Sequence, residues 1–370
     1  MSNTQDHVYM ARAIQLARRG HYTTHPNPRV GCVIVRDGEI VGEGFHARAG
    51  EGHAEVNALA KAGDKASGAD VYVTLEPCSH HGRTPPCSQA LIDAGVKRVV
   101  SAMEDPNPKV AGNGISMINE AGIETETGVM QAEAEALNPG YLKRMRTGKP
   151  FVRSKIAMSL DGRTAMASGE SKWITSVDAR LDVQRLRASS DAILTGIETV
   201  LKDDPSLNVR LDDLPEDVPS DIPQPLRVVM DSHLRMSDNA KMLSLNGKTI
   251  IFTASDDRKL AGKLENKGAS VVKVKKHDGH VDLFAVMEYL AQQEINEVMV
   301  EAGSTLNGAL LQAGLIDEMV IYVAPKLMGD NAKGLFHLPA LAKMSEAIDL
   351  NITDIRSVGK DLRITARIVK

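Results

Sequence analysis

The sequence is poor in the residues that nucleic-acid-binding proteins need. Only 3% of its 370 residues are aromatic, and 48 acidic residues outnumber 44 basic ones, for a formal net charge of −4. A protein that binds long nucleic acids normally presents a basic face with stacking aromatic side chains. No basic stripe stands out along this chain. We therefore expect small-molecule chemistry, with no nucleic acid as a partner.

Cysteine and long apolar runs are scarce as well. Three cysteines, an odd count, argue against a disulfide framework. No apolar run reaches membrane-spanning length, and the first residues do not read as a signal peptide, so we expect no membrane association. A reducing cytoplasm fits this composition because it keeps Cys78 and Cys87 available as thiolates. Cys32, inside an apolar run, is expected to be a small buried hydrophobic residue.

The Gly-x-Gly-x-x-Gly fingerprint of dinucleotide-binding folds is also missing. Gly112-Asn113-Gly114 lacks the third glycine and opens no clear βαβ unit. Any nicotinamide cofactor must therefore bind in another way. Residues 300–308 predict a strand end, a turn of small residues and a helix start, whose backbone N–H groups can bind phosphate. Taken alone this signal is weak, since many α/β proteins carry small residues at such a turn.

Hydrophobic periodicity predicts a layered α/β domain over residues 1–147. The dipeptide Asp37-Gly38 is typical of the type I′ turn that joins two strands of a hairpin. Helices are expected at residues 7–19, 53–63 and 87–95, and strands at residues 30–35, 39–44, 70–76 and 97–103.

A second α/β domain is expected over residues 148–370. Residues 211–225, rich in Asp and Pro, should form a surface loop rather than a domain boundary. A helix is predicted at residues 176–189, and strands at residues 191–195, 226–230, 249–253, 270–274, 297–301 and 319–323.

His53, Cys78 and Cys87 form a candidate zinc site. One imidazole and two thiolates supply the three protein ligands of a catalytic zinc, which keeps a fourth position open. His-x-Glu followed by Pro-Cys and a second Cys is the signature of zinc deaminases, in which the glutamate, here Glu55, moves protons and does not bind the metal. The expected helices place His53 and Glu55 in the first turn of one helix, and Cys78 and Cys87 flank the start of another. Helix starts carry positive partial charge, which favours thiolate. We predict hydrolytic deamination of a ring.

Other interpretations of these residues stay open from the sequence. They could be scattered core residues, or a structural zinc site, which normally has four Cys or His ligands; His46, His80 or His81 could be the fourth. A zinc-stabilised protein could also bind a partner without turnover. The spacing of Glu55 and the Pro-Cys turn after a strand favour the catalytic site.

Several motifs make the chain similar to the bifunctional riboflavin-biosynthesis deaminase/reductase family. They are HPNPRVG at 25–31, GHAE at 52–55, LEPCSHHGRTPPC at 75–87 and DPNP at 105–108. Residues 150–370 resemble the reductase half of that family. The resemblance implies a cytidine-deaminase-like three-layer α/β/α domain and a dihydrofolate-reductase-like α/β domain. It also implies zinc-dependent deamination of a diamino-pyrimidinone that carries a phosphoribosylamino group, then NADPH-dependent reduction of the ribosyl unit to ribityl.

The same resemblance implies roles for individual residues. His53, Cys78 and Cys87 would hold zinc, with Glu55 as the proton carrier, and Asn27 would contact the pyrimidine. The positions that match cofactor contacts are Ala157, Trp173, Thr199, Asp203, Ser232, Gly303, Ser304, Thr305, Leu306, Asn307, Gly308 and Ala309. The positions that match substrate contacts are Ser171, Arg187, Leu207, Arg210 and Glu301, and Lys155 is a candidate to polarise or protonate the ribosyl group.

Three of these residues have a side chain that suits the implied role on physical grounds. The flat ring of Trp173, the single tryptophan, suits packing beside a nicotinamide. Arg187 and Arg210 offer guanidinium forks to a sugar phosphate. From the sequence alone, a pair of surface arginines is the favoured interpretation.

The spacing between Cys78 and Cys87 also bears on function. Zinc deaminases usually have Cys-x-x-Cys, whereas residues 79–86 separate the two cysteines here. The intervening loop, with His80, His81 and Arg83, could meet a phosphate, although a solvated polar loop explains it equally well. A nucleoside or tRNA-editing deaminase with an unrelated C-terminal domain is the alternative enzyme, and the long insertion and the missing basic patch argue against it. We expect a homodimer or homotetramer.

Overall fold

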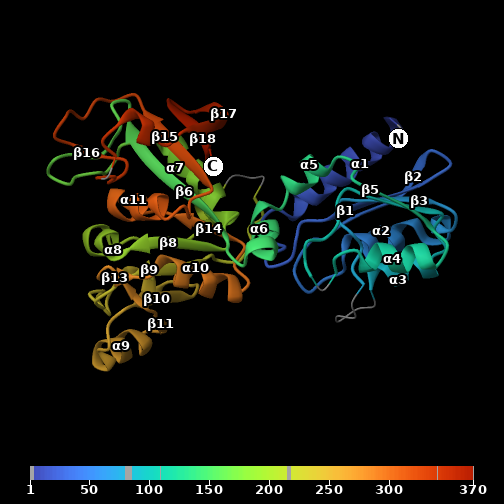
Figure 1. Ribbon diagram of the computed structural model, residues 1–370, viewed down its shortest axis with the longest axis horizontal. Coiled ribbons are helices and arrows are strands. Elements are labelled where there is room, and N and C mark those ends of the chain that lie inside the picture. Colours follow the sequence, from blue (N-terminus) through green and yellow to red (C-terminus); the bar gives the residue numbers. More distant parts are fainter. Residues whose placement is uncertain (1–3, 80–85, 109, 215–217, 340, 370) are drawn as a thin grey trace. The chain divides into compact units, whose positions relative to one another are not determined.

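The computed structural model describes residues 4–79, 86–108, 110–214, 218–339 and 341–369 (Figure 1). The chain forms two compact units, Met1–Lys149 and Pro150–Lys370. Within the described ranges, none of the helices combines the length and the apolar character that crossing a membrane requires.

The N-terminal unit is built on a five-stranded sheet with the order β2-β1-β3-β4-β5. β1 is antiparallel to β2 and β3, whereas β3, β4 and β5 are parallel, so the carboxyl ends of these three strands share one edge. Asp37 and Gly38, between β1 and β2, both have positive φ (51° and 80°), as the predicted type I′ turn requires. The strands are β1 (Gly31–Arg36), β2 (Glu39–Phe45), β3 (Asp70–Val73), β4 (Arg98–Ser101) and β5 (Glu124–Thr127).

Helices cover both faces of this sheet, which confirms the predicted three-layer α/β/α architecture (Figure 1). One face packs against α1 (Thr4–Ala17), α5 (Gln131–Glu135) and α6 (Pro139–Thr147), and the other against α2 (Ala54–Ala62), α3 (Cys87–Asp93) and α4 (Asn113–Glu120). Cys32 is fully buried in the second of these cores, as predicted for a small hydrophobic residue.

The start of α2 lies directly against β2. A Cβ atom on Gly44 would stand 2.2 Å from the backbone oxygen of Ala54, so only glycine allows this approach. The approach fixes the helix start that carries His53 and Glu55.

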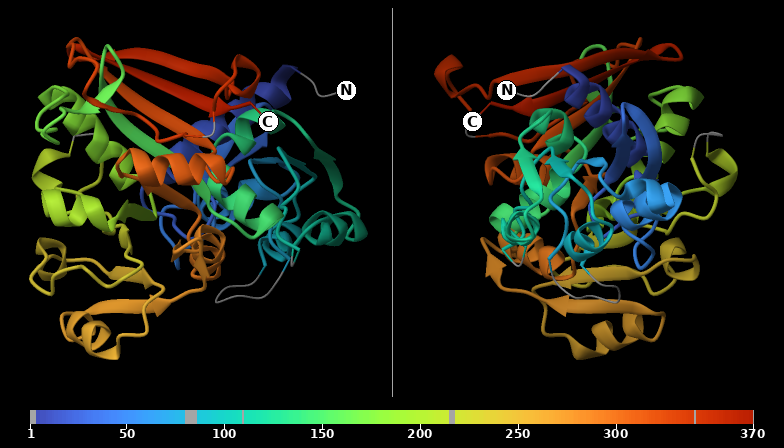
Figure 2. Two further views of the ribbon diagram at one scale, coloured as in Figure 1. Left: turned by 60° about the vertical axis from the view of Figure 1, so that its left-hand side comes forward. Right: turned by 90° about the vertical axis from the view of Figure 1, so that its right-hand side faces the viewer.

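The C-terminal unit contains a nine-stranded sheet with the order β11-β10-β9-β8-β14-β6-β15-β18-β17. Across the sheet, the strands β11, β10, β9, β8, β14, β6 and β15 are all parallel to one another. β18 is antiparallel to β15, and β17 is antiparallel to β18. Figure 2 shows β15, β18 and β17 side by side in orange and red. The strands are β6 (Phe151–Ser159), β8 (Ala192–Gly196), β9 (Leu226–Met230), β10 (Thr249–Thr253), β11 (Ala269–Lys273), β14 (Glu297–Val300), β15 (Glu318–Ala324), β17 (Leu350–Val358) and β18 (Asp361–Ile368).

Two hydrophobic cores lie on opposite faces of this larger sheet. One core includes α10 (Leu283–Gln292) and α11 (Ser304–Gln312), and the other includes α7 (Val177–Ala188), α8 (Ile197–Asp203) and α9 (Arg258–Glu265). The α/β class predicted for both domains is thus confirmed. Short strands β7 (Arg163–Ala165) and β16 (Lys333–Gly334) pair outside the large sheet.

Candidate active sites

Three potential metal ligands from separate elements converge in the N-terminal unit. His53 precedes α2, Cys87 is the first residue of α3, and Cys78 follows β3 in a turn. His53 Nδ1 lies 3.6 Å from Cys78 Sγ and 3.3 Å from Cys87 Sγ, and all three ligand atoms lie within 4.8 Å of one another. Neighbouring nitrogen and sulfur ligands of a tetrahedral zinc stand roughly 3.5 Å apart. The donor set and its spacing therefore fit zinc.

The surroundings of Cys78 favour its thiolate. The Cys87 thiol, the His53 imidazole and the backbone N–H of Cys87 all hydrogen-bond the sulfur of Cys78 and lower its pKa to about 4. The hydrogen bond to Cys78 also raises the pKa of His53. The pKa of the Cys87 thiol shifts the other way, because its hydrogen bond to Cys78, its burial and the charge of Glu55 all raise it. Cys78 therefore supplies the thiolate, the form that binds metal.

Glu55 is the second residue of α2 and is buried beside this group. Burial and the neighbouring Cys78 raise the pKa of Glu55 to about 7, and Glu55 also hydrogen-bonds Cys87. A carboxyl group that titrates near neutral pH can both accept and donate a proton. Its position matches the proton carrier expected from the sequence.

His46 has partners other than the metal group. Its Nδ1 lies 3.1 Å from the Gly52 backbone oxygen, and its Nε2 lies 3.1 Å from Asn27 Nδ2. Its ring packs edge-on against His53, with centroids 5.3 Å apart. These contacts argue against His46 as a fourth ligand and place Asn27 near the metal group. The other candidates, His80 and His81, lie outside the described residues, as does Arg83.

A largely buried charged group lies in the C-terminal unit. Glu301, just after β14, accepts two hydrogen bonds from Arg187 of α7, at 2.7 and 3.0 Å. Lys155 Nζ of β6 lies 3.8 Å from the same carboxylate. Arg187 also donates to the backbone oxygen of Asn208 at 2.9 Å. Arg187, with 14% of its side chain exposed, is therefore a largely buried, paired side chain and not the surface arginine that the sequence favoured.

These charges shift one another's protonation. Burial alone would raise the pKa of Glu301, but the Arg187 and Lys155 cations hold it at about 2. Burial lowers the pKa of Lys155, with Glu301 opposing the shift and Arg187 adding to it. Arg210 also acts on Glu301 through its charge, and its half-exposed side chain pairs with Asp213 at 2.5 Å. Arg210 is thus the more accessible of the two predicted phosphate-binding arginines.

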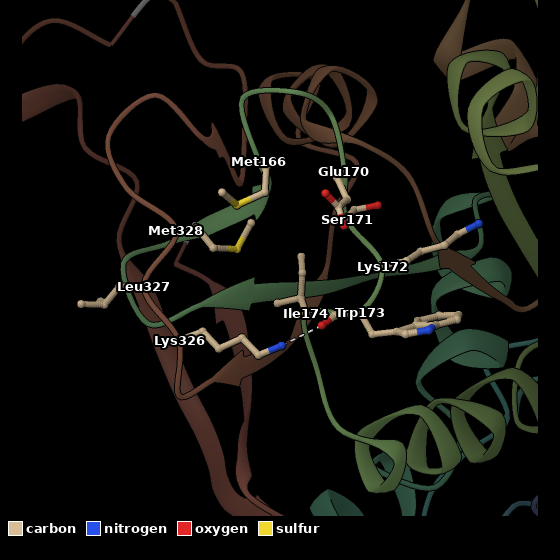
Figure 3. Close-up of a pocket in the computed structure, with 9 residues that line it drawn as sticks. All are labelled: Met166, Glu170, Ser171, Lys172, Trp173, Ile174, Lys326, Leu327 and Met328. Atoms are coloured by element: carbon tan, nitrogen blue, oxygen red, sulfur yellow. Dashed lines mark hydrogen bonds between the residues drawn. The ribbon is translucent and has the colours of Figure 1, made fainter.

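Ser171 and Trp173 line a pocket of about 440 Å³ (Figure 3). The pocket lies between residues 166–174 and residues 326–328, and Lys326 Nζ donates to the Trp173 backbone oxygen at 2.7 Å. Trp173 is 63% exposed, and the Arg180 guanidinium stacks on its ring, 4.6 Å from the centroid. Neither Arg180 nor Lys326 was singled out from the sequence, because only the folded chain brings them to the tryptophan.

The predicted cofactor positions gather along one edge of the large sheet. Ser232 follows β9, Thr199 and Asp203 lie on α8 after β8, and residues 303–309 follow β14. Carboxyl ends of parallel strands are where open α/β sheets bind ligands. Ala157 lies in the second half of β6, opposite Tyr322 of β15.

Not all of these positions offer a free side chain. Asn307 is buried: it accepts a hydrogen bond from Ser154 at 2.7 Å and donates to the Ala302 backbone oxygen at 2.8 Å. A Cβ on Gly308 would meet the His337 backbone oxygen at 2.2 Å. Because Asn307 and Gly308 are in contact with other parts of the protein, Gly303, Ser304 and Thr305 at the start of α11 are the residues of this segment that can contact a ligand.

Leu207 and Ser232 also use their side chains within the protein. The Leu207 side chain is 2% exposed and packs in the core shared with α7. The Ser232 hydroxyl accepts a hydrogen bond from the backbone N–H of Val281 at 3.0 Å. Leu207 can therefore meet a ligand mainly through its backbone.

The two units match two family models. The model of the RibD C-terminal domain matches residues 150–364, and that of the cytidine and deoxycytidylate deaminase zinc-binding region matches residues 3–103. The riboflavin biosynthesis protein RibD of Escherichia coli K12 is 55% identical over 363 residues, which cover 97% of this chain and 98% of that protein. The chain belongs to the RibD family.

Solved RibD structures share the fold of the whole chain. RibD from Acinetobacter baumannii superposes with a TM-score of 0.91 at 46% identity, over 99% of both chains. A Thermotoga maritima relative superposes with a TM-score of 0.86 at 32% identity, also over 99% of both chains.

Membership of the RibD family decides between the functions left open by the sequence. The chain is a bifunctional deaminase and reductase of riboflavin biosynthesis, with a zinc-binding deaminase domain. Because the C-terminal half also matches RibD, a nucleoside deaminase with an unrelated second domain is not favoured.

Proposed function

We propose that this enzyme deaminates a diamino-pyrimidinone that carries a phosphoribosylamino group, and then reduces the ribosyl unit with NADPH. The Thermotoga maritima relative is described as a diaminohydroxyphosphoribosylaminopyrimidine deaminase and a 5-amino-6-(5-phosphoribosylamino)uracil reductase. The observation that carries the proposal is the His53, Cys78 and Cys87 group with Glu55 buried beside it.

In the first step, His53, Cys78 and Cys87 would hold the zinc ion. Bound zinc supplies a Lewis acid that makes a water molecule acidic near neutral pH. Glu55 would accept a proton from the attacking water and would later donate a proton to the departing amine, which leaves as ammonia. Burial suits Glu55 to both roles because it raises the carboxyl pKa to about 7.

Asn27 orients the pyrimidine in this proposal. Its Nδ2 lies against His46 Nε2, which directs its Oδ1 the other way. Burial lowers the pKa of His46, so its neutral ring can accept that hydrogen bond. Asn27 Oδ1 then accepts from an amino or ring N–H of the substrate.

In the second step, Gly303, Ser304 and Thr305 at the start of α11 would bind the pyrophosphate of NADPH, and Trp173 would pack on its nicotinamide. Bound NADPH would supply the hydride, and the protein would align the cofactor with the sugar carbon and exclude water. Lys155 polarises or protonates the ribosyl oxygen, since burial lowers its pKa and eases the loss of its proton.

The charged group around Glu301 holds the rest of the substrate. Glu301, fixed by Arg187, accepts from sugar hydroxyls, and Arg210 binds the phosphate. Ser171 and the backbone at Leu207 complete this set.

We also propose that the enzyme works as a homodimer or homotetramer in the cytoplasm. The exposed apolar residues of β17 support association of two copies, since long apolar edge strands are normally covered. Cys32, Cys78 and Cys87 are all free, as a reducing compartment requires.

Replacing Glu55 by Gln tests the deaminase proposal. The variant keeps the shape of the side chain but cannot carry a proton, so deamination should slow by about 10²- to 10⁴-fold while zinc content is unchanged. Glu51→Gln, an exposed neighbour, should deaminate at the wild-type rate. Deamination by Glu55→Gln within a few fold of wild type would refute the role of Glu55.

A further inference from the structure

Glu76, two residues before Cys78, is a buried carboxylate with an unusual set of partners. Its Oε1 accepts from the backbone N–H groups of Gly114 (2.9 Å) and Ile115 (3.3 Å). Its Oε2 accepts from those of Gly112 (2.9 Å) and Asp105 (3.1 Å). The side chain is 3% exposed, so these four donors replace its hydration.

The four donors belong to the loop after β4 and to the first turn of α4. Gly112 precedes α4 with φ of 76°, and Gly114 lies so close to the Pro77 backbone oxygen that a Cβ would stand 1.9 Å from it. The N-terminus of α4 is therefore pressed against the peptide that leads into Cys78. The Glu76 carboxylate caps this helix end across the chain and holds the two segments together.

The other side of the same turn is held by α3. The Cys78 backbone oxygen accepts from the backbone N–H of Ser88 at 3.2 Å and from its hydroxyl at 3.1 Å. The backbone N–H of Cys87 points at Cys78 Sγ from 3.3 Å. Cys78 thus lies between two helix starts, with Ser88 as the anchor on α3 and Glu76 as the anchor on α4.

We propose that Glu76 is a positioning residue that holds Cys78 in place for zinc. The inference rests on the proposed zinc set of His53, Cys78 and Cys87. Glu76 does not touch the metal group; it acts through Pro77, by fixing the loop and helix start that this peptide packs against. Outer partners of metal ligands typically contribute about 10- to 100-fold to metal affinity.

Glu76→Gln tests the inference with little change in volume. The amide keeps one acceptor oxygen but places an NH₂ group against two of the four backbone N–H donors. Zinc affinity, measured by competition with a chromogenic chelator, should fall about 10- to 100-fold. Reductase activity of the same preparation should stay at the wild-type level, because Glu76 belongs to the other unit. Glu104→Gln, an exposed neighbour with the same charge change, should bind zinc like wild type.

Amide hydrogen exchange of the wild-type enzyme gives a second test that needs no variant. If Glu76 joins Cys78 to α4, zinc binding should slow exchange at Gly112, Gly114 and Ile115 as well as at Ser88. Unchanged exchange at Gly112, Gly114 and Ile115, or wild-type zinc affinity in Glu76→Gln, would overturn the role of Glu76 and leave the proposed zinc set standing. A wild-type chain that binds no zinc would overturn the proposed zinc set and the inference with it.

Discussion

Glu301 shows how strongly one largely buried carboxylate depends on its neighbours. Arg187 and Lys155 hold its pKa at about 2, against an ordinary value of 4.5. A folded-state pKa below the unfolded one stabilises the fold above the unfolded value, and this contribution is lost as pH falls toward the folded value. Glu301 therefore stabilises the C-terminal unit at neutral pH and loses that effect between about pH 4.5 and pH 2.

Glu301→Gln should remove this pH-dependent contribution. At pH 7 the variant should be about 3 kcal/mol less stable, because two largely buried cations, Arg187 and Lys155, lose their partner. The gap to wild type should shrink by roughly 1 kcal/mol by pH 3.5, since only the wild-type group titrates. Urea unfolding followed by the fluorescence of Trp173, which lies in this unit, measures the gap.

A control variant separates this effect from general acid sensitivity. Glu288→Gln, at an exposed position of α10, should unfold like wild type at every pH. A Glu301→Gln gap that stays constant from pH 7 to pH 3.5 would contradict the assigned pKa shift.

Among single residues, the sequence predicts the metal ligands and Glu55 better than it predicts the contacts that hold the two sites in place. His53, Glu55, Cys78 and Cys87 stand in a spacing that only a few kinds of chemistry require, so they could be found without a structure. The partners of Glu76 are backbone N–H groups from about 30 to 40 residues away along the chain, and no side-chain pattern marks them. The burial of Arg187 likewise depends on tertiary packing against Glu301.

At the scale of elements, β17 is the least protected strand of the large sheet. It forms an edge, and Ile352 and Ile355 are 53% and 59% exposed. In the β17–β18 ladder, Ile352 pairs with Ala366 and Ile355 pairs with Ile364. The two isoleucines therefore extend the apolar face on which Ile364 packs against the core around α11. In the proposed oligomer, a second copy of the chain covers these exposed side chains of β17.

Charged residues on β17 should break this association. The double variant Ile352→Lys, Ile355→Lys should sediment as a smaller species than wild type, because buried lysines cannot pair across the interface. Val8→Lys replaces an apolar residue of similar exposure on α1 and should leave the oligomer intact. An oligomer of unchanged size in the double variant would exclude β17 as the interface.

Elements with a continuous apolar run were predictable from the sequence. The strands at residues 226–230 and 249–253 were predicted with the bounds that the structure gives. β6 was not predicted because Arg153 and Lys155 interrupt its apolar run. In the structure, glutamates from neighbouring strands or turns neutralise these two charges. β3 ends at Val73, three residues before the predicted end, because the chain turns toward Cys78.

At the scale of the whole molecule, one chain combines two kinds of chemistry in two separate units. The metal group and Glu55 lie in the first unit, and the charged group around Glu301 lies in the second. Each half should therefore act with its own cofactor. The first reaction should need zinc alone, and the second should need NADPH and the product of the first.

Mass spectrometry of the proposed substrate tests this account most directly. The diamino-phosphoribosylamino-pyrimidinone is incubated with zinc-loaded enzyme, with and without NADPH. Without NADPH the account predicts exchange of one amino group for a carbonyl oxygen and no further change. With NADPH it predicts the same exchange followed by the addition of two hydrogens. An unchanged substrate in both samples, with zinc content and folding confirmed, would contradict the proposed function.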